Sequence, residues 1–183
     1  GRGRYSKAYF GLERYDNLMA SSRGHSVPVV NGYAQQEGRE HAAQVLQHCH
    51  DAAGDRLELE MAAAYPAAAG LKSLRRSLSL DRTTANGRVL LEDRFSFAGD
   101  EARFQSVLVT PLAVSSDAGR VVIGEAGGGV AVDYDADVLE VLLDRHDGQE
   151  KQYQPAVDLI RVVFTPRQQS RAGRLALTIS PLT

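Results

Sequence analysis

The sequence predicts an all-β fold, an antiparallel multi-stranded β-sandwich with about ten or more strands and little helix. Short apolar runs recur with turn signals about every 8–12 residues. No stretch has the sustained 3.6-residue period of a confident helix. The composition, 43% hydrophobic and 24% charged, is ordinary for a globular protein, and a length of 183 residues fits a single domain over residues 1–183.

The first elements are short. Residues 1–20 combine tyrosines with charges and predict a strand, then a short helix around 12–19. A strand over 26–30 ends at Asn31-Gly32, a turn dipeptide because both residues tolerate positive φ. Residues 40–53 fit either a helix, by composition, or a strand, by alternation.

Residues 56–61 alternate most clearly, which predicts a half-buried strand with Glu58 and Glu60 on its polar face. A hairpin follows, with strands over 74–82 and 88–97 joined through Asn86-Gly87. Each of its apolar faces carries one charge, Arg76 and Asp93.

A buried lone charge is costly, so we expect Arg76 and Asp93 each to be paired. A two-residue turn at Asn86-Gly87 would place Leu80 opposite Asp93. Pairing Arg76 with Asp93 would therefore need a bulge, and other partners are the alternative.

The second half predicts six further strands, separated by turns at Ser115–Gly119, Gly127–Gly129 and His146–Gly148. These strands cover residues 104–110, 120–123, 130–134, 138–143, 157–164 and 174–179.

Charge and composition exclude several classes of protein. The net charge of −2 lacks the clustered basic excess of a nucleic-acid-binding protein, so we expect no nucleic-acid partner. No apolar run approaches the about 20 residues that a membrane span needs. The single cysteine, Cys49, excludes an internal disulfide. The chain begins with Gly1 instead of methionine, and we expect it to be a piece of a longer protein.

Two stretches in the first hundred or so residues resemble a known family, the carboxy-terminal β-domain of heparinase II/III-like polysaccharide lyases. The first resembles the family's His-(Asn/Ser)-x-Pro-x-(Ile/Val)-(Asn/Asp)-Gly-x-x-Gln element, and the second its "Ala-Tyr-Pro … Gly-Leu-Lys … Arg-x-Leu … Asp-x-Phe" run. The matching residues are Ser21–Gly32 with Gln35, then Ala64-Tyr65-Pro66, Gly70-Leu71-Lys72, Arg75–Leu78 and Leu91–Phe95. This resemblance favours a strand over the ambiguous residues 40–53.

The resemblance implies a module of a lyase that cleaves uronic-acid-containing polysaccharide by β-elimination. It implies that His25 is a zinc ligand, and that Tyr33 and Gln35 face the cleft and contact an acidic polysaccharide. The guanidinium of Arg75 suits carboxylate and sulfate groups, which predicts a further contact with the polysaccharide, and a solvated arginine on a polar face is the alternative. The family's other ligands and its catalytic histidine belong to a preceding His-x-His-x-Asp stretch, which this sequence lacks. We therefore expect an incomplete zinc site, no catalytic residue of its own, and no activity from this chain alone.

The resemblance also implies an upstream (α/α) toroid domain as a partner and a periplasmic or secreted location, with a cytoplasmic parent protein as the alternative. We further expect that the chain can form a homodimer through an exposed face. A non-catalytic carbohydrate-binding or domain-packing β-sandwich is the second functional reading.

Three other groupings resemble sites. His48 and His50 would share one strand face with Cys49 on the other, giving two metal ligands, and surface histidines on an edge strand explain them equally well. Asp133–Asp137 resembles the start of a calcium loop but has Val138 where that loop needs glycine. Glu58 and Glu60 have a spacing open to paired acids, but the alternation favours an ordinary polar face.

Overall fold

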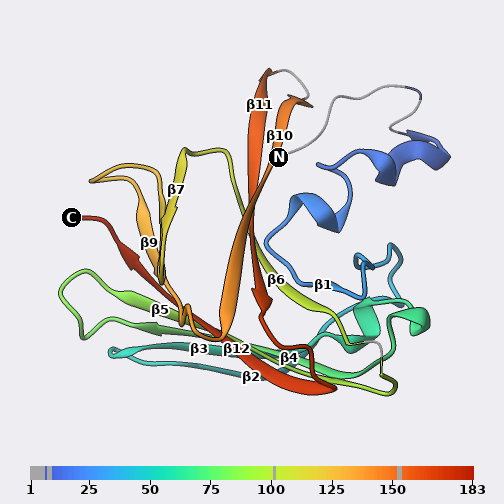
Figure 1. Ribbon diagram of the computed structural model, residues 1–183, viewed down its shortest axis with the longest axis horizontal. Helices are drawn as coiled ribbons and strands as arrows, with labels where there is room; N and C mark the ends of the chain where they lie inside the picture. The colour runs from blue at the N-terminus through green and yellow to red at the C-terminus, as the bar shows by residue number, and fades with distance from the viewer. Residues whose placement is uncertain (1–6, 8–9, 101, 152–153) are drawn as a thin grey trace.

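A computed structural model describes residues 7, 10–100, 102–151 and 154–183. Within these ranges the chain forms two antiparallel sheets packed against each other (Figure 1), which confirms the predicted β-sandwich. The larger sheet has the spatial order β2 (Gln44–His50), β3 (Gly54–Glu60), β4 (Leu71–Asp81), β5 (Arg88–Phe97), β12 (Ala172–Pro181), β9 (Val130–Asp133), β8 (Arg120–Ile123), β7 (Val114–Asp117). The smaller sheet has the order β1 (Val29–Val30), β6 (Phe104–Thr110), β11 (Gln154–Pro166), β10 (Leu139–Lys151).

Helical structure in the described chain is limited to short 3-10 turns, and no helix there is long and apolar enough to cross a membrane. The 3-10 turns include η2 (Leu12–Asp16), η3 (Ser22–Gly24), η4 (Ala62–Ala64) and η5 (Ala67–Ala69). The predicted helix around 12–19 is therefore only the short turn η2. The strand predicted before it falls largely on residues outside the described ranges.

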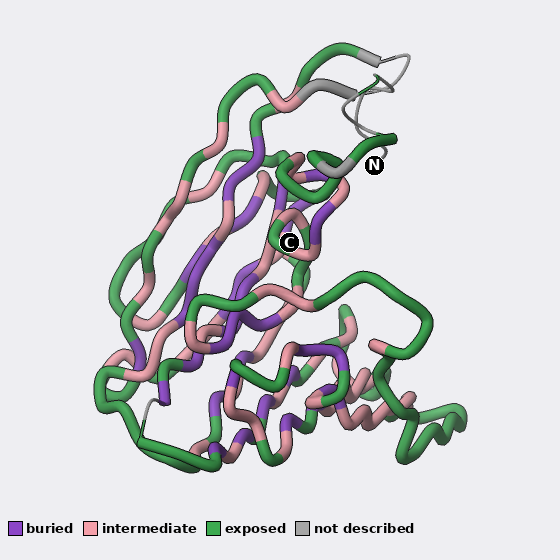
Figure 2. Tube along the Cα trace, turned by 90° about the vertical axis from the view of Figure 1, so that its right-hand side faces the viewer, coloured by how far each residue is buried: buried purple, intermediate pink, exposed green. Residues whose placement is uncertain are grey.

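The main core lies between the two sheets and takes its largest side chains from both. Phe95 of the larger sheet stacks on Phe104 of the smaller one with ring centroids 4.3 Å apart, and Phe97 meets Phe95 edge to face at 5.7 Å. Phe164 is completely buried. In Figure 2 the buried stretches run along the strands, and most connecting loops are exposed. The alternation of side chains along each strand therefore buries one face of the strand in the interior that the two sheets share.

The β4–β5 hairpin corrects the predicted register. The ladder closes at Asp81 opposite Arg88, so the connection contains residues 82–87 and not only Asn86-Gly87. The Asp81 carboxylate accepts from the Thr83 amide at 2.9 Å and pairs with Arg88 at 3.1 Å. These contacts end the ladder early, and the shifted register places Arg76 directly opposite Asp93.

Two predicted turns are strand instead. Residues 114–117 form β7, and only Ala118-Gly119 connects it to β8, with Gly119 at φ 81°. His146–Gly148 lies inside β10, where the register against β11 shifts between His146 and Gln149. Gly148 has φ 62°, so the glycine serves a β-bulge that lets the strand continue.

The segment before β1 is also less regular than predicted. The expected strand over 26–30 shrinks to Val29–Val30, because polar groups of Ser26 bond to Arg76 and Val109 and not to a neighbouring ladder. Residues 44–50 form β2, so the strand favoured over residues 40–53 is confirmed.

Candidate functional site

A buried ion pair lies between the sheets, beside the segment that contains His25. Arg76 Nε and Nη2 donate to the two carboxylate oxygens of Asp93 at 2.7 and 2.8 Å. The two side chains are 6% and 0% exposed. Such a two-pronged pair forms because β4 and β5 place the residues opposite each other on their inward faces.

The remaining polar atoms of this pair also have partners. Ser106 Oγ accepts from Arg76 Nη2 at 3.1 Å and donates to Asp93 at 2.7 Å. Arg76 Nη1 donates to the Ser26 carbonyl at 2.8 Å. A buried pair is tolerated when its other hydrogen-bonding groups are satisfied. Here the partners join the strands β4, β5 and β6 to the segment that contains His25.

We call residues 21–35 the anchored segment, because several hydrogen bonds hold it against the sandwich. The Tyr65 hydroxyl donates to the Pro28 carbonyl at 2.6 Å, and Ser26 Oγ accepts from the Val109 amide at 2.9 Å. Farther along, the Asn31 side chain donates to the Ala69 carbonyl at 3.0 Å. The two stretches that resemble the lyase family therefore meet in space.

Asn31 holds the turn that ends the anchored segment. Its side-chain oxygen accepts from the Arg103 amide at 2.7 Å, and its own amide donates to the Arg103 carbonyl at 2.8 Å. Its φ of 49° lies in the left-handed region, which asparagine tolerates better than most residues. The predicted turn is confirmed, and its asparagine also docks the segment.

Tyr65 acts as a hydrogen-bond donor. Burial raises the pKa of its phenol well above the usual range, and the nearby Arg76 guanidinium and a hydrogen bond with the Gln35 side chain only partly offset this. The phenol therefore stays protonated and is a poor general base. Gln35 is itself half-buried, and its backbone amide donates to Ser22 Oγ at 2.8 Å.

The two other candidates in the segment are exposed. His25 follows η3, and its carbonyl accepts from the Val27 amide at 2.8 Å. Tyr33 is 41% exposed and pairs with Val30 through an isolated bridge. Both side chains therefore belong to the outer surface of the anchored segment and are accessible to a ligand.

Arg75 does not join these residues. It follows β4 on the face opposite Arg76, which is the outer face of the larger sheet. Its guanidinium lies 3.6 Å from Glu60 and 3.9 Å from Glu58. The predicted set therefore separates into His25, Tyr33 and Gln35 on one segment and Arg75 on another surface.

Glu60 is occupied by local structure. It accepts from Ser73 Oγ at 2.6 Å, the Leu74 amide at 2.8 Å and the Ala62 amide at 3.0 Å. Burial alone would raise the pKa of Glu60, but these bonds and Arg75 outweigh it and lower the pKa. Glu58 and Glu60 thus take part in the ion pairs of a polar sheet face.

The described residues do not fit a zinc site. No three His, Cys, Asp or Glu side chains among them gather closely enough to hold a metal ion. His25 contributes one nitrogen, whereas structural zinc takes about four ligands. His48 and His50 are exposed on the edge strand β2, with His50 3.5 Å from Asp55.

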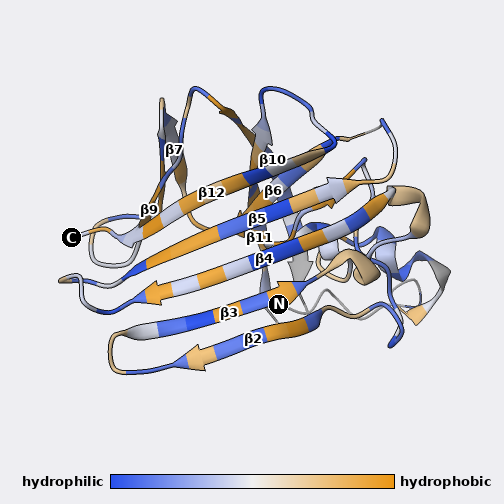
Figure 3. Ribbon diagram, turned by 90° about the horizontal axis from the view of Figure 1, so that it is seen from below, coloured by the Kyte–Doolittle hydropathy of each residue, from blue (hydrophilic) through white to orange (hydrophobic). Residues whose placement is uncertain are grey.

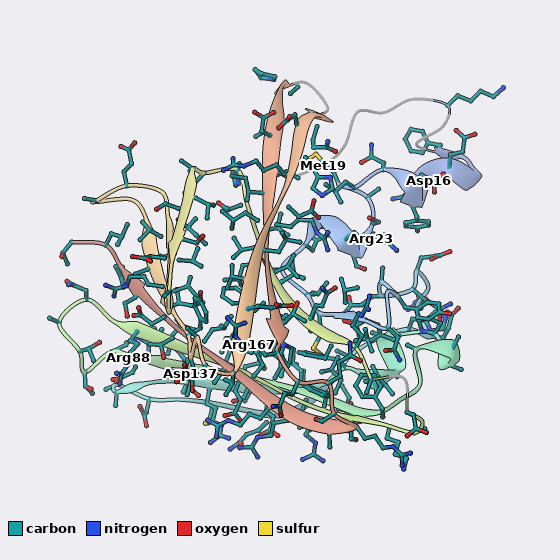
Figure 4. The ribbon with its side chains drawn as sticks, viewed as in Figure 1. Asp16, Met19, Arg23, Arg88, Asp137 and Arg167 are labelled. Carbon is teal, nitrogen blue, oxygen red and sulfur yellow. The ribbon has the colours of Figure 1, made fainter. Side chains whose placement is uncertain are left out.

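Hollows at one end of the sandwich were not predicted. The first, of about 380 Å³, is lined by Phe95, Val138 and Pro166 together with Asp137 and Arg167, which lie near each other in Figure 4. Arg167 Nε donates to the Ala136 carbonyl at 3.0 Å, which positions its guanidinium.

A second hollow, of about 280 Å³, begins at the anchored segment. It is lined by Asn31, Gly32, Ala102, Arg103 and Gln169. A third, small hollow shares lining residues with both, so we call the three hollows together the end groove. Its walls come from loops distant in sequence, and the polar run 167–170 is the only local signal of it in the sequence.

Comparisons with solved structures give the same fold. The chain is similar to a mutant of the heparan sulfate lyase HepC from Pedobacter heparinus, with TM-score 0.73 and 15% identity over 100% of this chain and 28% of that one. It is also similar to a heparinase III, with TM-score 0.74 and 11% identity over 100% of this chain and 27% of that one. A lysine-methylated form of heparinase III gives 0.71 and 10%, over 98% and 26%.

The chain thus spans about a quarter of the length of these structures, as a single domain of such enzymes would. Identities this low show a shared fold. No protein-family model and no curated protein matches the sequence.

Proposed function

We propose that this chain is the carboxy-terminal β-sandwich module of a polysaccharide lyase of the heparinase II/III type, which cleaves uronic-acid-containing polysaccharide by β-elimination. The observation that carries the proposal is full coverage of this chain at TM-scores of 0.73 and 0.74, against 28% and 27% coverage of the lyases. An upstream toroid domain would form the rest of the parent protein.

The chemistry explains why the module would need that partner. β-Elimination requires neutralisation of the uronate carboxylate, a base for the C5 proton and an acid for the leaving 4-oxygen. In the described part of this chain, the Tyr65 phenol is buried and bound to the Pro28 carbonyl, and the exposed His25 side chain forms no hydrogen bond or ion pair with an acid or base. The module would therefore supply one wall of the cleft and not the full catalytic set.

The surface that would face the polysaccharide includes His25 and Tyr33, with Gln35 supporting the segment from behind. Both exposed side chains stand on a segment that the interior of the sandwich holds in place. Binding residues on a fixed support lose little conformational entropy when a ligand binds. Arg75, already close to two carboxylates, would contribute weakly.

A turnover assay on the isolated 183-residue chain tests the division of labour. With heparan, alginate and chondroitin polymers we expect no absorbance from unsaturated products, and clear product would overturn the proposal. In the parent protein, His25→Ala should reduce turnover, while Arg88→Ala, at the start of β5, should leave it unchanged. Equal turnover of the two variants would contradict a role for His25.

The second candidate is a non-catalytic carbohydrate-binding module, and the end groove is the observation that favours it. Under this reading the isolated chain would bind oligosaccharides and the parent protein would show no lyase activity. Titration of the isolated chain with defined uronate and neutral oligosaccharides, followed by NMR, separates the two readings. A periplasmic or secreted location fits either function, since both act on extracellular polymers.

A further inference from the structure

The two sheets end in four edge strands, β2 and β7 in the larger sheet and β1 and β10 in the smaller. An edge strand exposes unpaired backbone N–H and C=O groups that can pair with another chain. Folded proteins block such pairing with short edges, charges, proline, bulges or covering segments. The four edges therefore allow a direct comparison.

Three of the edges are protected. β1 has two residues, both buried, and Ser26 next to it already takes the Val109 amide of β6. β7 has four residues and carries Asp117. β10 contains a β-bulge near Gly148 and charged side chains along its length, namely Glu140, Asp144, Arg145 and Asp147.

The edge strand β2 has fewer protections: its ladder against β3 is irregular between Val45 and Gln47, but the pairing is regular from Gln47 to His50. All seven of its residues, Gln44–His50, are exposed. None of them is Lys, Arg, Asp, Glu or Pro, and its side chains at Val45 and Leu46 are 59% and 41% exposed. Figure 3 shows β2 at the margin of the larger sheet, with β3 as its one neighbour there.

We propose that β2 pairs antiparallel with β2 of a second copy of this chain, which makes one continuous sheet across a two-fold axis. A strand paired antiparallel with itself satisfies two-fold symmetry without any further surface. Because β2 contains no Lys, Arg, Asp or Glu, two copies bring none of these charges face to face, as the other long edge, β10, would.

The faces of β2 indicate the register of this pairing. Gln47 and Cys49 lie opposite Glu58 and Arg56, whereas His48 lies opposite Leu57 on the other face. A two-fold axis at His48 sets Gln47 opposite Cys49 of the second copy, so that side chains meet on the same face. An interface of two short strands falls below the roughly 1,200 Å² of standard complexes, so the dimer is expected to be weak and reversible.

Sedimentation velocity of the 183-residue chain over a concentration series tests the proposal. We expect a reversible monomer–dimer equilibrium that Leu46→Lys weakens at least tenfold, and the same for Gln47→Lys, which changes no packed side chain. The matched control is Ser116→Lys on β7, with no effect. Circular dichroism checks that each variant is folded.

A disulfide scan gives an independent test. With Cys49→Ser as background, single cysteines at positions 45–50 should cross-link best at or next to position 48 and less on either side. A monomer at all concentrations, a dimer indifferent to both β2 lysines, or a flat cross-linking profile would each overturn the proposal. So would a monomeric parent protein in which the β2 amides resist hydrogen exchange, because another domain would then cover the edge.

Discussion

Arg75 and Arg76 are neighbours in the sequence and lie in opposite surroundings. Arg76 is 6% exposed and grips Asp93 with two hydrogen bonds, and its remaining nitrogen holds the carbonyl of Ser26. Arg75 is 56% exposed and stays 3.6 and 3.9 Å from two glutamates. The same type of side chain therefore stabilises the interior on one face of β4 and belongs to a solvated surface on the other.

The difference shows where charge determines the fold. In the interior an unpaired charge keeps its full desolvation cost, so both partners must be present together. On the outer face water screens each charge, and removing one partner costs little. The alternation of a single strand decides which rule applies. The following variants test this contrast.

The largest expected effect is on the interior pair. Asp93→Ala leaves the Arg76 guanidinium buried without its partner, and we expect a loss of about 3–5 kcal/mol in the free energy of unfolding. Urea denaturation measures it. The control is the double variant Arg76→Met with Asp93→Leu, which should recover much of the loss because no charge remains inside. If the free energy of unfolding of Asp93→Ala lay within about 1 kcal/mol of that of the unsubstituted chain, the contrast between the two faces would be refuted.

Tyr65→Phe tests the anchored segment with a smaller change. It keeps the buried ring but leaves the Pro28 carbonyl without the phenol donor, and we expect a loss of about 1–3 kcal/mol. Hydrogen exchange should accelerate at residues 21–35 and not in β12. Uniform acceleration throughout both sheets would mean that the hydroxyl supports the whole core and not the segment.

The pH dependence of stability tests the charged groups on the outer face of the larger sheet. The lowered pKa of Glu60 means that the folded state favours its carboxylate over the proton, relative to the ordinary value of 4.5. Its contribution to stability is therefore present above about pH 4.5 and is lost as the pH falls through the lower folded pKa. Glu60→Gln should flatten that acid limb of the stability curve, as thermal unfolding between pH 3 and 7 would reveal, and an unchanged slope would contradict the assignment.

Arg75→Ala should have the smallest effect. An exposed pair at such distances contributes about 0–1 kcal/mol, and added salt screens what there is. We expect unfolding free energies within this range of the parent chain, and a difference that shrinks at 0.5 M NaCl. A loss comparable with that of Asp93→Ala would show that the outer face is not a solvated surface.

Alternation allowed much of the sheet to be predicted from sequence. The strands at 88–97, 104–110 and 120–123 were predicted with the bounds that the structure has, because each is a short run rich in apolar residues between clear turn signals. The hairpin register was missed, because the Asp81 side chain ends the ladder before Asn86-Gly87 is reached. Gly148 was read as a turn because a bulge and a turn both use a glycine at positive φ.

The candidate site could be predicted only in part. The sequence pointed to the anchored segment and to a partner for Arg76, but the identity of that partner depended on a hairpin register set by side chains. The end groove was out of reach, because Asn31, Arg103 and Gln169 meet only through the packing of separate loops. The sequence shows a polar run at 167–170, but nothing in it indicates that this run meets Asn31 and Arg103.

Two of the hydrogen bonds that hold the anchored segment are made to peptide carbonyls, those of Ser26 and Pro28, and not to side chains. Every amino acid has such a carbonyl, so these hydrogen bonds do not depend on the side chains that the segment exposes. Exposed positions such as His25 are thereby free to be exchanged for other residues while the attachment stays intact. A fixed backbone with replaceable side chains is an economical starting point for altering recognition, by natural divergence or by deliberate redesign.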